Sequence, residues 1–182
     1  MNDQRSNSGS VIWITGLSAS GKTTLAREVV ETLKSQGCNS IFLDGDELRK
    51  LFVEHSDHGD TFDRNSRLKL SLQYSRLCAH LVEQGFTVVI STISMFNEVY
   101  RWNEEHFENY LLVFLDISLE LLKQRDPKNI YAEYFDGNRS NVSGLDLKVD
   151  TPVHADITFT DLTVREPSTM AHTVVKMHLD RK

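Results

Sequence analysis

One stretch of eight residues near the amino terminus constrains this chain more than any other. Residues 16–23 read Gly-Leu-Ser-Ala-Ser-Gly-Lys-Thr and match the pattern GxxxxGK[ST]. The apolar run at residues 11–15 precedes it, and residues 24–36 follow with apolar side chains at helical spacing. A strand, a glycine-framed loop and a helix in this order are the context in which the pattern forms a phosphate-binding loop. The alternative is an ordinary strand–turn–helix connection in which Gly-Lys-Thr occurs by chance.

The residue types in this loop suit a triphosphate. Glycines allow a tight turn, so consecutive backbone N–H groups point inward, and the helix N-terminus adds the positive end of its dipole. Lys22 is expected to reach the β- and γ-phosphates as a catalytic residue, and the Thr23 hydroxyl to bind Mg²⁺. The loop therefore predicts a nucleoside triphosphate site formed by Gly16, Ser18, Ala19, Ser20, Gly21, Lys22, Thr23 and Thr24.

Composition narrows the class of protein. A chain of 182 residues, 40% of them hydrophobic, is expected to fold as one domain around one core. Its net charge of −6, without a basic tract, argues against a nucleic-acid partner. Cys38 and Cys78 lack metal or redox spacing and are expected to be buried thiols in a reducing compartment. Since no apolar run is long enough to cross a membrane or to serve as a signal core, we expect a cytoplasmic protein without a membrane partner.

Apolar runs alternate with helical patterns along the chain. Strands are predicted at 11–15, 41–43, 86–90, 111–115 and 156–160, and helices at 24–36, 47–52, 64–84, 97–109, 118–125 and from Pro167. Short connections between them favour right-handed crossovers and an α/β protein, in which helices sandwich a central parallel sheet. Residues 1–10 are expected to be a disordered lead-in, and residues 11–182 a single domain.

Two acids, Asp44 and Asp46, flank a glycine directly after the second predicted strand. Open parallel sheets bind their ligands at the carboxyl ends of the strands, so both carboxylates are candidates for catalysis, and Asp44 is also a candidate metal ligand. The competing interpretation is structural, with Asp46 capping the short helix at 47–52. The two roles are compatible, and the phosphate loop nearby favours the functional one.

The segment after Arg125 departs from the helical pattern. Pro127 disfavours helical geometry at Asp126, and the residues up to about 144 are polar, with two glycines and the basic side chains of Lys128 and Arg139. Long loops in a compact domain are usually functional lids or disordered segments. We predict a lid at about residues 126–144 that is mobile without ligand and closes over bound nucleotide.

Further motifs distinguish between two classes of phosphate-loop protein. Neither of the strings typical of GTPases, Asn-Lys-x-Asp and Asp-x-x-Gly, occurs in this sequence. A small kinase needs an acid near the acceptor, a lid, and cations that offset charge on the transferred phosphoryl group. The pair Asp44 and Asp46, the predicted lid, and the cations Arg49, Arg64 and Lys128 meet these needs.

Several motifs taken together resemble the adenylylsulfate kinase family. They are the phosphate loop, Leu-Asp-Gly-Asp at 43–46, Asp-Arg at 63–64, Ile-Ser at 93–94 and Arg-Asp-Pro-Lys at 125–128, in an order that spans residues 11–152. The resemblance implies a three-layer αβα P-loop kinase fold with a mobile lid. It also implies transfer of a phosphoryl group from ATP, with Mg²⁺, to the 3′-hydroxyl of adenosine 5′-phosphosulfate. A homodimer is compatible with it.

By position, the resemblance assigns roles to individual residues. Asp46 resembles the acid that contacts the acceptor hydroxyl, and Arg49 and Arg64 resemble arginines that hold the acceptor's anionic groups. Lys128 resembles a lid lysine that acts near the phosphates and the acceptor. The remaining implied contacts are Arg67, Ile93 and Ser94 for the acceptor and Arg125 for ATP.

The acceptor half departs from the family pattern. Gly59 and Val142 stand where the family has aromatic residues, Arg67 stands where it has asparagine, and Phe62 could replace one aromatic face. Base–aromatic stacking is worth roughly 1–3 kcal/mol per base, so its loss weakens adenine binding. The acceptor is therefore adenylylsulfate or a related anhydride, such as cytidine diphosphoramidate for cell-surface polysaccharide modification. A non-catalytic nucleotide-binding homologue is the remaining alternative, and the retained acids and Lys128 argue against it.

Overall fold

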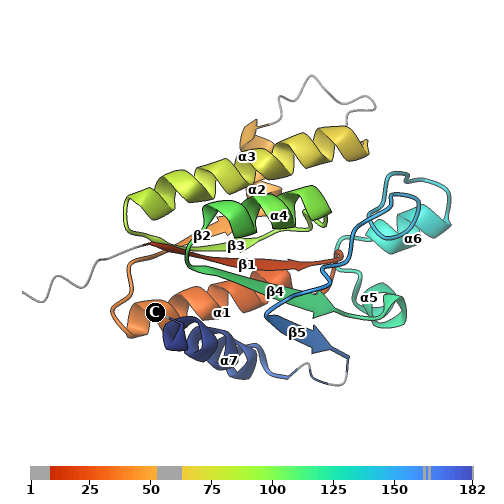
Figure 1. Cartoon of the computed structure of the whole chain (residues 1–182). Coiled ribbons are helices and arrows are strands. Elements are labelled where there is room, and N and C mark those ends of the chain that lie inside the picture. The colour runs from red at the N-terminus through yellow and green to blue at the C-terminus, as the bar shows by residue number, and fades with distance from the viewer. Residues whose placement is uncertain (1–8, 53–62, 162, 164, 182) are drawn as a thin grey trace, which may run out of the picture.

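The structure is a computed structural model that describes residues 9–52, 63–161, 163 and 165–181. Its strands form one five-stranded sheet in which every neighbouring pair is parallel (Figure 1). The order is β2-β3-β1-β4-β5, with bounds Ser10–Gly16 for β1, Ser40–Asp44 for β2, Thr87–Ser91 for β3, Tyr110–Asp116 for β4 and Ile157–Thr160 for β5. The predicted central parallel sheet is confirmed.

Helices cover both faces of this sheet (Figure 1). One face is covered by α1 (Lys22–Ser35) and α7 (Pro167–Asp180), and the other by α2 (Gly45–Phe52), α3 (Arg64–Glu83) and α4 (Asn97–His106). Two short helices, α5 (Leu119–Arg125) and α6 (Ile130–Phe135), lie beyond the carboxyl ends of the strands. The predicted three-layer αβα architecture is confirmed.

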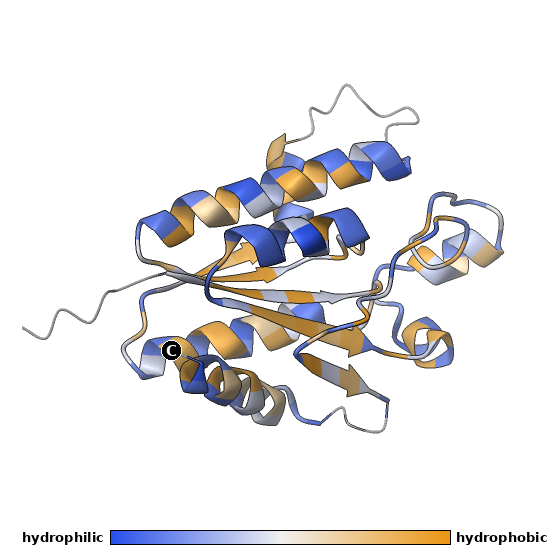
Figure 2. Cartoon of the chain, in the orientation of Figure 1, coloured by the Kyte–Doolittle hydropathy of each residue, from blue (hydrophilic) through white to orange (hydrophobic). Residues whose placement is uncertain are grey.

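The apolar runs, coloured orange along the strands in Figure 2, are continuous because the central strands β1, β3 and β4 are buried on both faces. In β1, Ile12 and Ile14 belong to the core shared with α1 and α7, whereas Val11 and Trp13 belong to the core shared with α3 and α4. Successive side chains of a strand point to opposite faces, so a strand covered on both sides is apolar throughout. The edge strand β5 instead alternates between buried and more exposed residues.

Some details differ from the sequence prediction. Gly9 and Ser10 are buried and Ser10 begins β1, so the disordered lead-in predicted for 1–10 is wrong for these two residues, and 1–8 lie outside the described residues. The helix predicted for 97–109 ends at His106, because the next residue is extended and buried. Cys78 is buried as expected, but Cys38 is only partly buried. Within the described part of the chain, none of the helices combines the length and apolar character needed to cross a bilayer.

The predicted lid contains a helix that the sequence did not reveal. The carboxylate of Asp126 accepts hydrogen bonds from the backbone N–H groups of Ile130, Tyr131 and Ala132 at 2.9, 2.9 and 3.0 Å, which satisfies the first turn of α6. Tyr131 is buried against the main core. A helix of six residues is too short for its hydrophobic period to stand out. Mobility of this segment stays a prediction.

The packing of α1 generates a first prediction. Leu33 is completely buried between the sheet and α7, so Leu33→Ala should lower the free energy of unfolding by about 3 kcal/mol through lost burial and a residual cavity. Urea denaturation measures this change. The neighbouring Lys34 is exposed and pairs with Glu31 at 3.3 Å. The control variant Lys34→Ala should therefore stay within about 0.5 kcal/mol of wild type. Equal losses in the two variants would contradict the packing.

Candidate active site

The carboxyl ends of the parallel strands meet at one edge of the sheet, beside α5 and α6 (Figure 1). The register pairs Asp44 at the end of β2 with Ser91 at the end of β3, and Gly16 at the end of β1 with Leu115 of β4. The phosphate loop after β1, the acids at and after the end of β2 and the hydroxyl groups at the end of β3 are therefore gathered in one place. This is where open parallel sheets bind their ligands.

The phosphate loop has the backbone conformation that its glycines predict. Gly16 has a φ of 149° and Gly21 a φ of 96°, in the region that disfavours side chains. A Cβ atom on Gly16 would lie 2.7 Å from the carbonyl oxygen of Leu115, so a larger residue does not fit. Ala19 has a φ of 61°, a strain that the motif does not reveal.

The Lys22 ammonium lies inside the loop. Its Nζ donates to the carbonyl oxygen of Leu17 at 2.6 Å and to the Ser20 hydroxyl at 3.5 Å. Burial lowers the pKa of Lys22 to about 8, although the charges of Asp46 and Asp44 act in the opposite direction. The side chain thus occupies a position in which it can exchange these partners for phosphate oxygens.

The Asp44 carboxylate joins three segments of the chain. Its Oδ2 accepts hydrogen bonds from the hydroxyl groups of Thr23 at 2.8 Å and Ser91 at 3.2 Å. Its Oδ1 accepts from the backbone N–H groups of Asp46 at 2.9 Å and Glu47 at 3.4 Å. Asp44 is therefore the residue that caps α2, and the alternative interpretation that gave this role to Asp46 is wrong. The reason is that α2 begins at Gly45, earlier than the sequence indicated.

The Asp46 carboxylate faces cations from two segments. Its Oδ2 accepts a hydrogen bond from Lys128 Nζ at 2.5 Å, and its Oδ1 lies 3.3 Å from Arg49 Nη2. Partial burial alone would raise the pKa of Asp46, but the hydrogen bond from Lys128 and the charges of Arg49, Lys128 and Lys22 bring it below its usual value. The acid therefore stays ionised and can accept a hydrogen bond from a hydroxyl group.

The lid helix contacts the phosphate loop directly. The Tyr131 hydroxyl donates to the carbonyl oxygen of Ser18 at 3.0 Å. A Cβ atom built on Gly144 would lie 2.8 Å from the side chain of Leu17, so the end of the predicted lid packs closely on the same loop. A change in the position of the lid is thus coupled to the loop that would hold the phosphates.

A cleft of about 920 Å³ lies between the phosphate loop and the lid, and we call it the main cleft. The predicted catalytic and nucleotide-binding residues that line it are Ser18, Ala19, Gly21, Lys22, Thr23, Thr24, Asp44, Asp46, Arg125 and Lys128. Gly16 and Ser20 belong to the loop but are not among the described residues that line this cleft. The fold thus brings the predicted nucleotide half of the site together.

A second cavity of about 270 Å³, which we call the side pocket, adjoins the main cleft. Arg49, Arg67 and Ile93 line both cavities, and Ser94 lines the side pocket. Arg64 is not among the described residues that line either cavity. Its Nη2 lies 2.8 Å from the Asp150 carboxylate, and its guanidinium also pairs with Glu98 at 3.4 Å. The structure therefore does not bring Arg64 to the predicted acceptor site.

Several polar residues of the site were missed in the sequence. Ser91 binds Asp44, and the hydroxyl groups of Thr92, Ser94 and Ser71 form a buried chain along the side pocket with 2.8 Å between neighbours. A signal was available for Ser91 and Thr92, because they directly follow the third apolar run as Asp44 follows the second. No pattern indicated Ser143, which meets the Arg67 guanidinium from a distant part of the chain.

The fold and the site define a phosphate-loop kinase. The model of the adenylylsulphate kinase family matches residues 8–160, and the chain belongs to that family. The predicted family and fold class are thereby confirmed. The predicted enzyme class, a phosphotransferase that uses a hydroxyl acceptor, is confirmed as well.

Two relatives and one solved structure show how far the similarity extends. The cytidine diphosphoramidate kinase of Campylobacter jejuni is 37% identical over 146 residues, which cover 80% of this chain and 83% of that protein. The adenylyl-sulfate kinase of Pseudomonas aeruginosa is 33% identical over 154 residues, covering 84% and 76%. The Mycobacterium tuberculosis APS kinase CysC in complex with AMPPNP and APS superposes with a TM-score of 0.82 at 29% identity, covering 94% of this chain and 98% of that chain.

The pKa of Lys22 leads to a prediction about nucleotide binding. With a pKa of about 8, close to half of the Lys22 side chains are neutral at pH 8, whereas bound phosphates favour the charged form. ATP binding at pH 8 should therefore take up about half a proton through this residue, and affinity should weaken as the pH rises above 8. Titration calorimetry in buffers of different ionisation enthalpy measures the uptake.

Lys22→Arg is the matched control, because its guanidinium stays charged throughout this range. Proton uptake that arises from ionisation of the nucleotide is the same in both proteins. Subtracting the uptake of the variant from that of wild type therefore leaves the contribution of Lys22. The difference should be about half a proton at pH 8 and close to zero at pH 6.5. An equal uptake in both proteins at pH 8 would contradict the lowered pKa.

Proposed function

We propose that this chain transfers the γ-phosphoryl group of ATP to the 3′-hydroxyl of a nucleotide 5′-anhydride, and that a cytidine diphosphoramidate-type acceptor is preferred over adenylylsulfate. Membership of the adenylylsulphate kinase family implies ATP as the phosphoryl donor. The observation that carries the choice of acceptor is the guanidinium of Arg67 in the wall between the two cavities.

Arg67 stands where the family resemblance implies a neutral amide. Its Nη1 donates to the Ser143 hydroxyl at 3.1 Å and its Nη2 to the carbonyl oxygen of Asn141 at 2.6 Å, so the guanidinium is held in place. Burial lowers the pKa of Arg67 to about 10, and the charge of Arg49 acts in the same direction. The group is still charged at neutral pH and suits a pyrimidine carbonyl oxygen or an anionic group better than an adenine ring.

The aromatic residues Phe52, Tyr74 and Phe96 line the side pocket, but none of them stands at either position where the family resemblance implies an aromatic residue. Val142, at one of the two positions where the resemblance implies an aromatic residue, is buried in the main core and has no aromatic face. The other position, Gly59, and the proposed substitute Phe62 lie outside the described residues. A pyrimidine is smaller than adenine and depends less on stacking. The higher identity to a protein named cytidine diphosphoramidate kinase, 37% against 33% for the Pseudomonas aeruginosa adenylyl-sulfate kinase, supports the same choice.

The proposed reaction is an in-line displacement at phosphorus. The 3′-oxygen of the acceptor bonds to the γ-phosphorus, the bond from this phosphorus to the β–γ bridging oxygen breaks, and ADP leaves. Asp46 orients the hydroxyl group and takes its proton late, because phosphoryl transfer is largely dissociative. Lys22 and Lys128 offset the negative charge that shifts toward the leaving oxygen, and Lys128 exchanges its present partner Asp46 for phosphate when the lid closes.

Mg²⁺ fits the oxygen ligands at the base of the main cleft. The Thr23 hydroxyl and the Asp44 carboxylate, 2.8 Å apart, would hold the ion directly or through its water molecules. No group of three or more His, Cys, Asp or Glu side chains suited to a metal occurs among the described residues. Magnesium at nucleotide sites does not require one, because phosphate oxygens and water complete its shell. The ion would neutralise charge on the β- and γ-phosphates.

Adenylylsulfate is the second candidate acceptor. The family model and the Pseudomonas aeruginosa relative favour it, and the Mycobacterium tuberculosis kinase with its bound APS has a similar fold. For either acceptor we propose a reaction in the cytoplasm on a small-molecule nucleotide rather than on nucleic acid. A homodimer stays a prediction.

A panel of acceptors tests the proposed specificity. Cytidine diphosphoramidate, CDP and adenylylsulfate are each incubated with ATP and Mg²⁺, and the 3′-phosphorylated product is measured by mass. We expect kcat/KM for the cytidine diphosphoramidate to exceed that for adenylylsulfate at least tenfold, since this ratio reports transition-state discrimination. Arg67→Asn, which restores the amide of the family pattern, should shift the preference toward adenylylsulfate, whereas Arg67→Lys should not. A wild-type preference for adenylylsulfate would overturn the proposal in favour of the second candidate.

Asp46→Asn tests the role of the acid. The substitution keeps the shape of the side chain but removes its charge, so ATP should bind within about threefold of wild type while kcat falls by about 10²–10⁴. Nucleotide binding by calorimetry and turnover with saturating acceptor separate the two effects. If ATP affinity falls in step with turnover, Asp46 instead binds metal or maintains structure, and Asp44 becomes the candidate for the acceptor hydroxyl.

A further inference from the structure

The side pocket has an unusual balance of charge. Four cationic residues line it, Arg49, Arg67, Lys69 and Lys148, and no Asp or Glu occurs among its described lining residues. The whole chain carries a net charge of −6, so this concentration of positive charge runs against the composition. A concave site lined by one sign of charge attracts ligands of the opposite sign. The pocket is therefore suited to a ligand that is at least partly anionic.

The four cations divide into two pairs by position. Arg49 and Arg67 line both cavities and lie where the side pocket opens into the main cleft, which also contains Asp46. Lys69 and Lys148 line the side pocket only. We call these two the distal lysines. They come from separate parts of the chain, one from α3 and the other from the segment before β5.

The acids near the distal lysines are already engaged by other groups. Asp63 caps α3 by accepting hydrogen bonds from two backbone N–H groups, and Asp146 accepts two more from the backbone of Asn141 and Val142. Asp150 pairs with Arg64 at 2.8 Å. Both distal lysines are exposed, and neither forms a hydrogen bond or ion pair with another described residue. Their ammonium groups are thus available to a ligand in the pocket.

We infer that Lys69 and Lys148 bind the anionic 5′-anhydride group of the acceptor and are specificity-determining residues of this kinase; the inference rests on the proposed function. The reacting 3′-hydroxyl must lie near Asp46, which lines the main cleft and pairs with Arg49 where the side pocket opens. An acceptor that enters the side pocket from there extends toward the distal lysines. Of its parts, the base is neutral and the 5′-anhydride is negatively charged. Coulomb attraction and charge-assisted hydrogen bonds therefore direct the anhydride to the lysine end.

The position of Arg64 gives an independent reason for this assignment. The family resemblance implies that this arginine holds the acceptor's anionic groups, but here it pairs with Asp150 and Glu98 and lines neither cavity as described. Arg49, the other arginine with this implied role, lines the side pocket but already pairs with Asp46 at 3.3 Å, so an anionic acceptor needs a further source of positive charge. The distal lysines provide it on the pocket wall.

The test compares acceptors that share the reacting hydroxyl and differ in charge. The variants are Lys69→Met, Lys148→Met and the double variant, and the probes are CDP and uncharged cytidine, with ATP and Mg²⁺ saturating. We expect kcat/KM for CDP to fall about tenfold in each single variant and about a hundredfold in the double variant, as for loss of charge-assisted hydrogen bonds. The value for cytidine and the KM for ATP should stay within about twofold of wild type.

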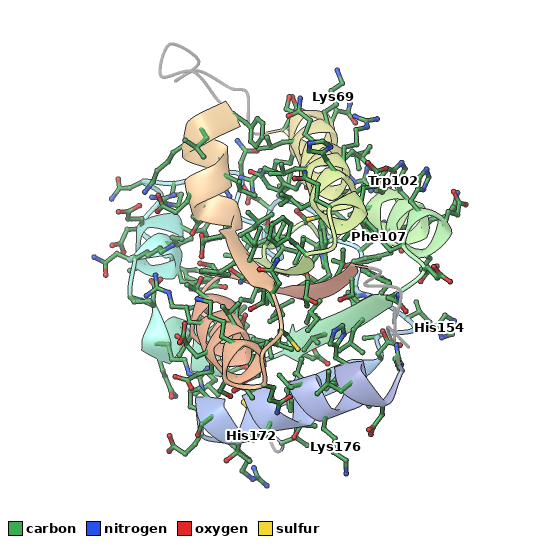
Figure 3. All side chains as sticks on the ribbon, turned by 90° about the vertical axis from the view of Figure 1, so that its left-hand side faces the viewer. Lys69, Trp102, Phe107, His154, His172 and Lys176 are labelled. Atoms are coloured by element: carbon green, nitrogen blue, oxygen red, sulfur yellow. The ribbon has the colours of Figure 1, made fainter. Side chains whose placement is uncertain are left out.

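Lys176→Met is the matched control, because Lys176 is exposed on α7, on the opposite side of the molecule from Lys69 (Figure 3). It should leave both acceptors unchanged. Equal losses for CDP and cytidine in the distal variants, or no loss for CDP, would overturn the inference. A variant that merely unfolds would lose ATP binding as well, which the KM for ATP detects.

A binding measurement separates failure of the inference from failure of the proposed function. Calorimetry follows the binding of inorganic pyrophosphate to protein saturated with a non-hydrolysable ATP analogue. We expect the double variant to bind pyrophosphate at least tenfold more weakly than wild type and Lys176→Met. If no nucleotide acceptor is phosphorylated, the proposed function fails, and this measurement still decides the inference: equal pyrophosphate affinity in all proteins overturns it.

Discussion

The carboxylate of Asp44 is the interaction on which the geometry of the site depends. It binds the hydroxyl groups of Thr23 and Ser91 and the backbone at the start of α2, and so joins α1, the end of β3 and α2. Because a partly buried carboxylate needs hydrogen-bond partners, these contacts hold the segments together. The position of Asp46, two residues further on, follows from this junction. A displaced Asp44 would separate the predicted acceptor acid from the phosphate loop.

The cations of the main cleft are positioned before any phosphate arrives. Lys22 donates to the carbonyl oxygen of Leu17, and Lys128 pairs with Asp46 across the cleft. These partners keep partly desolvated charges satisfied, but each can be exchanged for a phosphate oxygen. Tyr131 connects the lid to the loop through Ser18. Binding of nucleotide, release of Asp46 and movement of the lid are thus expected to be coupled.

The two halves of the site differ in how closely they follow the family. The nucleotide half keeps the loop, the acids and the lid lysine in one cleft. In the acceptor half, Arg64 is committed to an acidic pair, Arg67 is held by Ser143, and lysines line the far wall of the pocket. The phosphoryl group that is transferred comes from ATP and is bound in the nucleotide half, separately from the acceptor. Changes confined to the acceptor half can therefore alter the substrate and leave the phosphoryl transfer chemistry unchanged. This separation is the physical basis for proposing a different acceptor within the same family.

The sequence by itself determined the parallel α/β fold and the nucleotide half, because the apolar runs, the glycines at 16 and 21 and the residues that follow them act through local geometry. Only the tertiary structure decided that Asp44 rather than Asp46 caps α2, that α6 forms within the lid, and that Arg64 turns to Asp150. It also brought Lys69 and Lys148 to one pocket, although they are far apart in the chain. Such contacts depend on how separate segments pack, and no local pattern encodes the distance between residues that meet only after folding.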